Sequence, residues 1–535
     1  MTMALNNVKS GVSAKGPLAD MSLDIWHLIL DQIDDRNDLC NICLTSRAWF
    51  TTAITHLYKT VPLAMRAWDL AALNDGKDPL RFARSVSRRL LDTKYEHLRN
   101  AVHELDYGEF HGERSSEMEK RLLALVDSLP NLQRVKIRGP LSQEALQGLE
   151  GHSKRISIYL LGEDGKRKIE TQLQNVVALG AVVNPFRASK GPNLDILDIQ
   201  KLLFACPNLT SFSLGVTGNY GGCVRSRPHA GTVYSFEFSG DETFPPLEEL
   251  SLSGYRLDED EWEYWQEKYP WSKLRALTLG PRYQANFLNL AAGYIKSLRN
   301  LTVQVYTDAD LKIKCSPLKN FLWTFTSLES LIVKGYYLTP GPIGNHPGLK
   351  HLCLHSFEPM KEGITRLTLD VEQLQELDKN CPYLETLEID LNRDGEWPED
   401  LLKALAAGFR NLRRLTLHLE LGLKSVNPGV GTDVLKCIYM EPALNENSAR
   451  EVGQRFFKWR SSSKLNVLVL KTGEPLRRYP QWEPFHSTYE RHHQITIEVY
   501  NPWKAENVYE KQNQVTFEVY NPWNTGGVPK VAIIT

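Results

Sequence analysis

Few residues have the types and spacing to carry out chemistry, and none of them completes a catalytic or metal-binding motif. Segment 162–166 places two glycines before a lysine, but it lacks the spacing of a phosphate-binding loop and the hydroxyl residue after the lysine. Cys40 and Cys43 form a single Cys-x-x-Cys pair, with no second pair nearby to complete a zinc site. Segment 316–319 reads Ser-x-x-Lys, but the companion motifs of the enzymes that use it are missing. We therefore expect a chain that is not an enzyme and that binds no metal or cofactor.

The composition is that of an ordinary globular protein. The chain has 535 residues, of which 42% are hydrophobic and 24% charged, and its formal net charge is -1. Because positive and negative charges nearly cancel, the net charge produces no strong electrostatic attraction to nucleic acid or to an anionic membrane. The most apolar stretch, 176–183, is far shorter than the ~18 residues of a membrane span. Eight cysteines are too few for a disulfide scaffold, so we expect a reduced, cytoplasmic or nuclear location without nucleic-acid or membrane partners.

The pattern Leu-x-x-Leu-x-Leu recurs along most of the chain and predicts its architecture. From Leu247 to Leu412 its copies begin 27, 24, 30, 21, 35 and 28 residues apart. Leucine-rich repeats are roughly 20–29 residues long, so most of these intervals hold one repeat. Weaker copies begin at Val102 and Ile156, and the clear copies begin at Leu132, Leu209, Leu247, Leu274, Leu298, Leu328, Leu349, Leu384, Leu412 and Leu465.

Each copy predicts a strand, and the residues before most copies predict a helix. The Leu-x-Leu alternation has period 2, which puts both leucines on one side of a strand. Helical spacing is found in segments 118–129, 318–325, 371–377, 401–409 and 449–459. One such unit cannot bury its apolar side alone, whereas stacked units share a continuous core. The expected fold class is therefore α/β, a leucine-rich-repeat solenoid with a parallel sheet on its concave side and helices outside.

Two segments do not fit this simple scheme. Segment 364–369 repeats the pattern inside the longest interval and could form a short strand or begin a helix. Segment 234–238 alternates aromatic and polar residues, which suggests an inserted strand.

The residues between the strand leucines must point to the concave side. They are small and polar in the middle of the array, basic at its start, and a mixture of histidine, acid and arginine near its end. An ordinary solvated sheet face is the plain interpretation, and binding of a protein substrate is the functional one. The residues predicted to contact a substrate are Arg134, Lys136, Arg138, Asn300, Gln304, His351, His355, Glu388, Asp390, Arg414 and His418.

Two short helices are predicted ahead of the repeats. Ser22 is a plausible N-cap for the first helix, whose apolar residues Ile25, Leu28, Ile29 and Ile33 recur at helical spacing. After a polar break at 34–38, a second helix carries Leu39 and Trp49. Helices of this size bury little surface alone, so they need the body of the protein or a partner.

This N-terminal segment resembles an F-box. Members of that family begin Leu-Pro-x-Glu-Ile/Val, continue with an Ile/Leu helix and Asp-Leu, and close with Ser-Arg-x-Trp. The chain has Met21-Ser22-Leu23-Asp24-Ile25, then Asp38-Leu39 and Leu44, and closes with the segment 46–49, Ser-Arg-Ala-Trp. It departs from the family where Met21 and Ser22 replace leucine and proline. Followed by leucine-rich repeats with Cys-Pro turns at Cys206 and Cys381, the segment is similar to those of the large fungal F-box families.

The resemblance implies a substrate-recognition subunit of a Skp–cullin–F-box ubiquitin ligase. In that case the F-box docks on a Skp-type adaptor and, through it, on cullin, while the repeats hold a substrate that the sequence does not identify. Two alternatives stay open: a helical cap for the solenoid, and an interaction scaffold with a degenerate F-box. The residues that the resemblance assigns to the adaptor contact are Met21, Ser22, Leu23, Ile25, Ile29, Leu39, Leu44 and Trp49.

The C-terminal segment contains a tandem duplication. Residues 489–503 recur 20 positions later as 509–523, and each copy alternates apolar and polar residues as a strand would. The copies could be a duplication without a function of its own or a pair of edge strands on the last repeat. The expected organisation is a flexible N-terminus at 1–16, an F-box at 17–60, a helical linker at 61–95, the solenoid at 96–472 and an extension at 473–535.

Overall fold

The structure of the protein is a computed structural model that divides by its internal contacts into two units. One unit comprises Met1–Asp164 with Leu173–Leu179, and the other Gly165–Gln172 with Gly180–Thr535. The model describes residues 22–33, 35–45, 47–63, 79–108, 113–139, 141–152, 155–163, 171–183, 196–216, 236–257, 259–280, 284–305, 316–356, 365–393, 395–420, 442, 444–460, 464–472, 495–500 and 532–534.

The first unit begins with a three-helix segment and continues with a parallel sheet. Strands β1 to β4 pair in sequence order, all in parallel. Its elements are α1 (Leu23–Leu30), α2 (Arg36–Thr45), α3 (Arg47–Lys59), β1 (Thr60–Pro62), α5 (Pro79–Leu91), η1 (Thr93–Tyr95), α6 (Glu96–Ala101), β2 (Glu104–Tyr107), α7 (Glu113–Ser128), β3 (Arg134–Ile137), α8 (Gln143–Glu150) and β4 (Ser157–Glu163).

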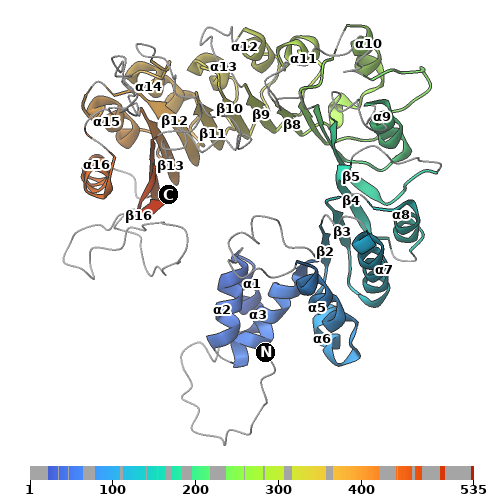
Figure 1. Cartoon of the computed structure of the whole chain (residues 1–535). Coiled ribbons are helices and arrows are strands. Elements are labelled where there is room, and N and C mark those ends of the chain that lie inside the picture. The colour runs from blue at the N-terminus through green and yellow to red at the C-terminus, as the bar shows by residue number, and fades with distance from the viewer. Residues whose placement is uncertain are drawn as a thin grey trace, which may run out of the picture. The chain divides into compact units, whose positions relative to one another are not determined.

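The second unit holds most of the repeats. Strands β6 to β14 pair in parallel and in sequence order, and helices α10 to α15 cover one side of them (Figure 1). Strand β5 (Val176–Val183) spans the boundary between the units. The other elements are α9 (Ile196–Ala205), β6 (Ser211–Val216), β7 (Glu249–Ser253), α10 (Glu259–Lys268), η2 (Trp271–Lys273), β8 (Ala276–Leu279), α11 (Gln284–Ala291), β9 (Asn300–Gln304), α12 (Ser316–Leu322), β10 (Ser330–Lys334), α13 (Pro340–Gly344), β11 (His351–His355), α14 (Val371–Asn380), β12 (Thr386–Leu391), α15 (Glu399–Ala407), β13 (Arg414–Leu419), α16 (Glu446–Trp459), β14 (Val467–Thr472), β15 (Ile495–Tyr500) and β16 (Ala532–Ile534).

A ladder of leucines forms the core of the second unit and confirms the predicted fold class. One leucine from each of the strands β7 to β14 stands opposite its equivalent on the next strand, and all of them are buried between the sheet and the helices. The ladder follows from the sequence, because the alternation in each Leu-x-Leu places both leucines on the same side of their strand. The ladder consists of Leu250, Leu277, Leu301, Leu331, Leu352, Leu387, Leu415 and Leu468.

Two sequence expectations need correction, and one that was left open is resolved. Strand β1 follows α3 directly and pairs with β2, so the parallel sheet begins inside the segment predicted as a helical linker. Residues 236–239 form no strand, because the buried Phe236 ring packs against Trp265 of α10 instead. Residues 365–369 also form no strand, and they lead to Asp370, which caps α14.

The C-terminal extension contributes an antiparallel edge to the sheet of the second unit. Strand β15, from the first copy of the duplication, pairs with β14, and β16 pairs with β15. The second copy, 509–523, lies outside the described residues. Among the residues that the structure describes, no helix is both long and apolar enough to cross a lipid bilayer.

Two glycines let consecutive strands of the second unit approach closely. Gly335 has a φ of +85°, and a Cβ atom there would lie 2.1 Å from the carbonyl oxygen of Val305. Gly254 repeats this geometry, with a φ of +69° and 2.1 Å to the carbonyl oxygen of Val216. Only glycine adopts such a φ without strain, so these positions hold the turn after β10 and the turn after β7.

We expect Gly335→Ala to destabilise the protein by about 3 kcal/mol or more, because strain of roughly 1–3 kcal/mol adds to the clash. Urea unfolding followed by circular dichroism measures the loss. Gly395 has a φ of +74° with nothing within 4 Å of its Cβ position, so Gly395→Ala isolates the strain alone. Gly348→Ala, which meets only an oxygen at 3.9 Å, should leave the midpoint unchanged. Equal losses for Gly335→Ala and Gly395→Ala would contradict the predicted clash.

Candidate functional site

Helix α1 has apolar side chains on two opposite sides, and only one side is covered. Trp26 and Leu30 are buried against the other two helices. Ile25, Leu28 and Ile29 are 46%, 66% and 41% exposed. Positions i, i+3 and i+4 share one side of a helix, so these three form a continuous stripe, which we call the α1 stripe.

The core of the three-helix segment shows which of the predicted adaptor residues are packed inside it, a distinction that the sequence could not make. Leu30, Leu39 and Ala53 form its buried centre, and Ile33, Ile42, Cys43, Trp49 and Leu57 pack around them. The Trp49 ring stacks on Trp26 with 3.8 Å between ring centroids. Leu39 and Trp49, predicted as adaptor contacts, therefore belong to this core.

The remaining predicted adaptor residues lie at the surface or outside the described side chains. Ser22 is exposed and caps α1, where its hydroxyl accepts the Ile25 N–H at 3.5 Å. Leu44, at the end of α2, is 85% exposed. Met21 and the side chain of Leu23 lie outside the described part of the chain. Sequence reasoning omitted two exposed residues, Leu28 and Phe50, although Leu28 already belonged to the predicted apolar side of the helix.

The basic residues predicted for the start of the array are paired with acids on the neighbouring strand. Lys136 Nζ lies 2.8 Å from Glu104 Oε1, and Arg134 Nη1 lies 3.5 Å from Glu104 Oε2. Arg138 Nε donates to Asp106 Oδ1 at 2.8 Å. These pairs cross from β3 to β2, so the basic character expected from β3 alone is largely neutralised.

In the second unit, the strand residues that point away from the leucine ladder form what we call the sheet face. Its first row contains Asn300, His351 and Arg414, all exposed and aligned by the strand register. His351 Nδ1 shares a 2.7 Å hydrogen bond with Thr386 Oγ1. Gln304, in the third row, is half-buried. These positions are available to a partner, and their contact with a substrate stays a prediction.

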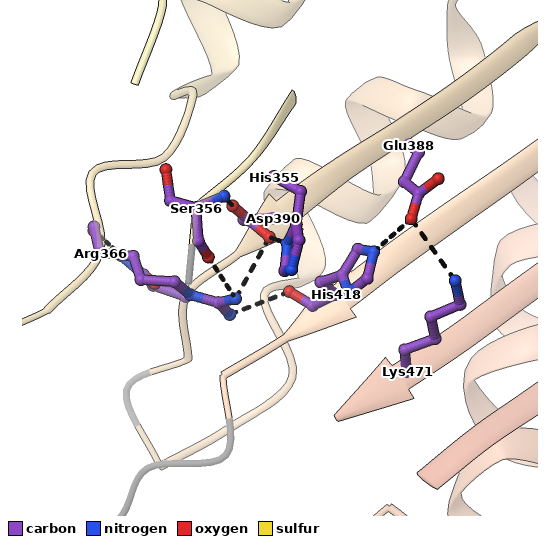
Figure 2. Close-up of polar contacts among 8 residues, drawn as sticks. His355, Ser356, Arg366, Glu388, Asp390, His418 and Lys471 are labelled. Atoms are coloured by element: carbon purple, nitrogen blue, oxygen red, sulfur yellow. Dashed lines mark hydrogen bonds and ion pairs between the residues drawn. The ribbon is translucent and has the colours of Figure 1, made fainter. Parts of the chain in front are cut away.

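His355, Asp390 and His418 are on the same face but are buried, which corrects the expectation of a solvated surface there. Arg366, on the segment between β11 and α14, covers them and is itself buried (Figure 2). Its guanidinium donates to Asp390 Oδ1 at 3.2 Å and to the carbonyl oxygen of His418 at 3.0 Å. Asp390 Oδ2 also accepts the Ser356 N–H at 2.5 Å. We call these residues, with Glu388 and Lys471, the buried polar network.

The two histidines join the acids of the buried polar network. His355 Nδ1 lies 2.7 Å from Asp390 Oδ1, and His418 Nε2 lies 2.5 Å from Glu388 Oε1. Their rings stack with centroids 3.9 Å apart (Figure 2). Lys471 Nζ is 3.4 Å from Glu388 Oε1. With both histidines neutral, the two cations and the two carboxylates balance.

The pKa values in the network reflect this balance. Burial acts to raise the pKa of Glu388, but the His418 hydrogen bond and the Lys471 charge outweigh it and lower that pKa to about 2. Burial likewise opposes ionisation of Asp390, and the charge of Arg366 still lowers its pKa. Burial lowers the pKa of His418 more than its bond to Glu388 raises it. The network is therefore stable with charged acids and a neutral His418.

The histidines of the network do not fit a metal ion. His355, Asp390 and His418 each present a ligand atom within 4.8 Å of the others. A metal binds imidazole nitrogen in the plane of the ring at roughly 2.0–2.1 Å. Two rings stacked 3.9 Å apart and only 23° from parallel cannot meet one ion in this way. Arg366, 3.2 Å from Asp390, would also repel a cation.

Comparisons with known proteins add a fold likeness only. No family model matches the chain, and no curated protein sequence matches it. Among solved structures, it is similar to the leucine-rich repeat-containing protein LegL7 from Legionella pneumophila, with 13% identity and a TM-score of 0.29. That match covers 70% of this chain and 94% of the other. The fold assignment rests on the strand register and the leucine ladder.

Proposed function

We propose that the chain is a non-catalytic substrate-recognition subunit of a Skp–cullin–F-box ubiquitin ligase. The observation that supports it is the α1 stripe, three large apolar side chains left exposed on a helix whose other side is already packed. Exposed apolar patches commonly mark sites of protein contact. The resemblance of this segment to an F-box indicates a Skp-type adaptor as the partner, and through it cullin.

The sheet face provides the surface for the substrate in this proposal. Its row of exposed Asn300, His351 and Arg414 offers an amide, an imidazole and a positively charged guanidinium as hydrogen-bonding groups on the sheet. Holding a substrate there raises the effective concentration of its lysines near the ubiquitin-charged enzyme, so the chain needs no catalytic residue. This role places the protein in the cytoplasm or nucleus, where such ligases act.

A second candidate is a leucine-rich-repeat interaction scaffold whose F-box no longer docks an adaptor. The replacement of proline by Ser22 at the start of α1 favours it. Ser22 nevertheless keeps the helix start intact, since its hydroxyl caps the first turn. The two candidates differ in whether the α1 stripe binds an adaptor.

The test is the affinity of the full chain for a purified Skp-type adaptor, measured by calorimetry. We expect Leu28→Ala/Ile29→Ala to weaken binding by about 30-fold or more, because the loss of a single buried anchor worth about 2 kcal/mol already has that effect. Alanine preserves the helix, and both side chains are exposed, so folding should be unaffected.

Trp323→Ala provides the matched control, because this side chain is 56% exposed but lies in the second unit. It should bind the adaptor as the unmodified chain does. A folded chain that binds no adaptor would overturn the ligase role and leave the interaction scaffold as the function.

A further inference from the structure

Two histidines connect α1, the helix that carries the α1 stripe, to α3. His27 Nδ1 on α1 and His56 Nε2 on α3 share a hydrogen bond of 2.8 Å. Their rings are tilted by 36° with centroids 5.0 Å apart. An imidazole–imidazole hydrogen bond needs an N–H on one ring and a bare nitrogen on the other. This contact therefore exists only while at least one of the two rings is neutral.

The surrounding charges balance only in that neutral state. His56 Nδ1 is 3.3 Å from Asp31 Oδ1 on α1, and the same oxygen accepts a bond from Lys59 Nζ at 3.1 Å. Lys59 and Asp31 already neutralise each other. Protonation of both histidines would thus place two uncompensated positive charges 2.8 Å apart.

Other elements packed on α3 do not supply the missing negative charge. The largest effects on His56 come from burial, Asp31, His27 and Lys59, in that order. From α2, the Arg36 guanidinium reaches α3, where it donates to the carbonyl oxygens of Leu57 and Thr60. The helix α6, also packed on α3, carries Glu96, His97 and Arg99.

We propose that His27 and His56 form a pH-sensitive latch that holds α1 on α3 at neutral pH and releases it in acid. The latch would control how firmly the α1 stripe is presented to its partner, and this consequence rests on the proposed function. Burial lowers the pKa of His56, so the attached helix resists protonation and the detached helix accepts it. The attachment of α1 to α3 therefore has its full stability above about pH 6.5, and this stability falls as the pH drops below that value.

Hydrogen exchange of the full chain, read in the peptide covering residues 22–33, tests the latch without any partner. After correction for the intrinsic exchange rate, we expect protection of α1 to fall about three- to tenfold between pH 7.5 and pH 5.5, the effect of losing one hydrogen bond. His27→Gln should reduce this pH dependence, because the amide oxygen accepts a bond even from protonated His56, while the effect of burial on His56 remains. His56→Gln gives the same expectation if His27→Gln fails to fold.

His152→Gln is the control, since His152 pairs with Asp127 at 3.1 Å in the same unit but away from α1. It should keep the pH dependence of the unmodified chain. Equal α1 protection at both pH values, or an unchanged drop in both glutamine variants, would overturn the latch.

Adaptor affinity at the two pH values gives a separate readout. We expect weaker binding at pH 5.5, by no more than the factor seen in exchange, and a smaller change in His27→Gln. A chain that binds no adaptor at either pH contradicts the proposed function, while the exchange measurement still decides the latch.

Discussion

Replacing Arg366 by alanine should destabilise the protein by about 3–5 kcal/mol, the usual cost of leaving a buried charge unpaired. Arg366 is 3% exposed, and it provides the only guanidinium within hydrogen-bonding distance of Asp390 in the described part of the chain. The Arg366→Ala change would also remove the hydrogen bond that the guanidinium donates to the carbonyl oxygen of His418. Arg366 precedes α14 and lies 52 residues before His418, so this one side chain joins the segment before α14 to β13.

Urea unfolding of Arg366→Ala measures this loss, and a double-mutant cycle identifies its origin. Arg366→Ala/Asp390→Asn should be more stable than Arg366→Ala alone, since the neutral amide removes the unpaired charge but can still accept the Ser356 N–H. Lys403→Ala is the surface control, because its ion pairs with Glu399 and Asp400 are exposed and contribute little. Additive effects of the Arg366 and Asp390 changes would show that the pair is not coupled.

Acid should destabilise the protein in two stages through the buried polar network. The pKa of His418 is lowered in the folded state, so stability is complete above about pH 6.5 and falls as the unfolded chain takes up protons below that value. The pKa of Glu388 is lowered from 4.5 to about 2, so its contribution is complete above pH 4.5 and is lost as the pH falls toward 2. With its side chain 31% exposed, Glu388 should contribute about 2 kcal/mol to the second stage.

Unfolding midpoints in urea at pH 7.5, 5.5, 4.5 and 3 separate the stages. His418→Gln should reduce the loss between pH 7.5 and pH 5.5, and Glu388→Gln should reduce the loss below pH 4.5. Glu329→Gln is the matched control, because Glu329 also pairs with a lysine but has a 40% exposed side chain. A pH profile unchanged by both network variants would place the acid sensitivity elsewhere in the chain.

The candidate site was only partly predictable from the sequence. Helical spacing grouped Ile25, Leu28, Ile29 and Ile33 on one apolar side of the first predicted helix, although Ile33 lies beyond the end of α1. The structure leaves the first three exposed and packs Ile33 with Leu30 against the core. Periodicity identifies which residues share a side of a helix, but the packing of α2 and α3 decides which of them are covered. For the same reason, only the three-dimensional contacts show that Leu39 and Trp49 pack in the core while Leu44 is exposed.

The amino-acid sequence by itself determined the repeat architecture. Each strand has its leucines at a period of two, and the copies recur at regular spacing, so the leucines become buried only if the repeats stack in register. It also predicted the first N-terminal helix and which residues point to the sheet face. It was wrong in placing Leu39 and Trp49 on one second helix, because the structure divides that stretch into α2 and α3. Only the tertiary structure decided that His355, Asp390 and His418 are buried and that Arg134, Lys136 and Arg138 are paired with two carboxylates, those of Glu104 and Asp106. Those outcomes depend on side chains from other strands and from a distant connection, whose contacts no local pattern encodes.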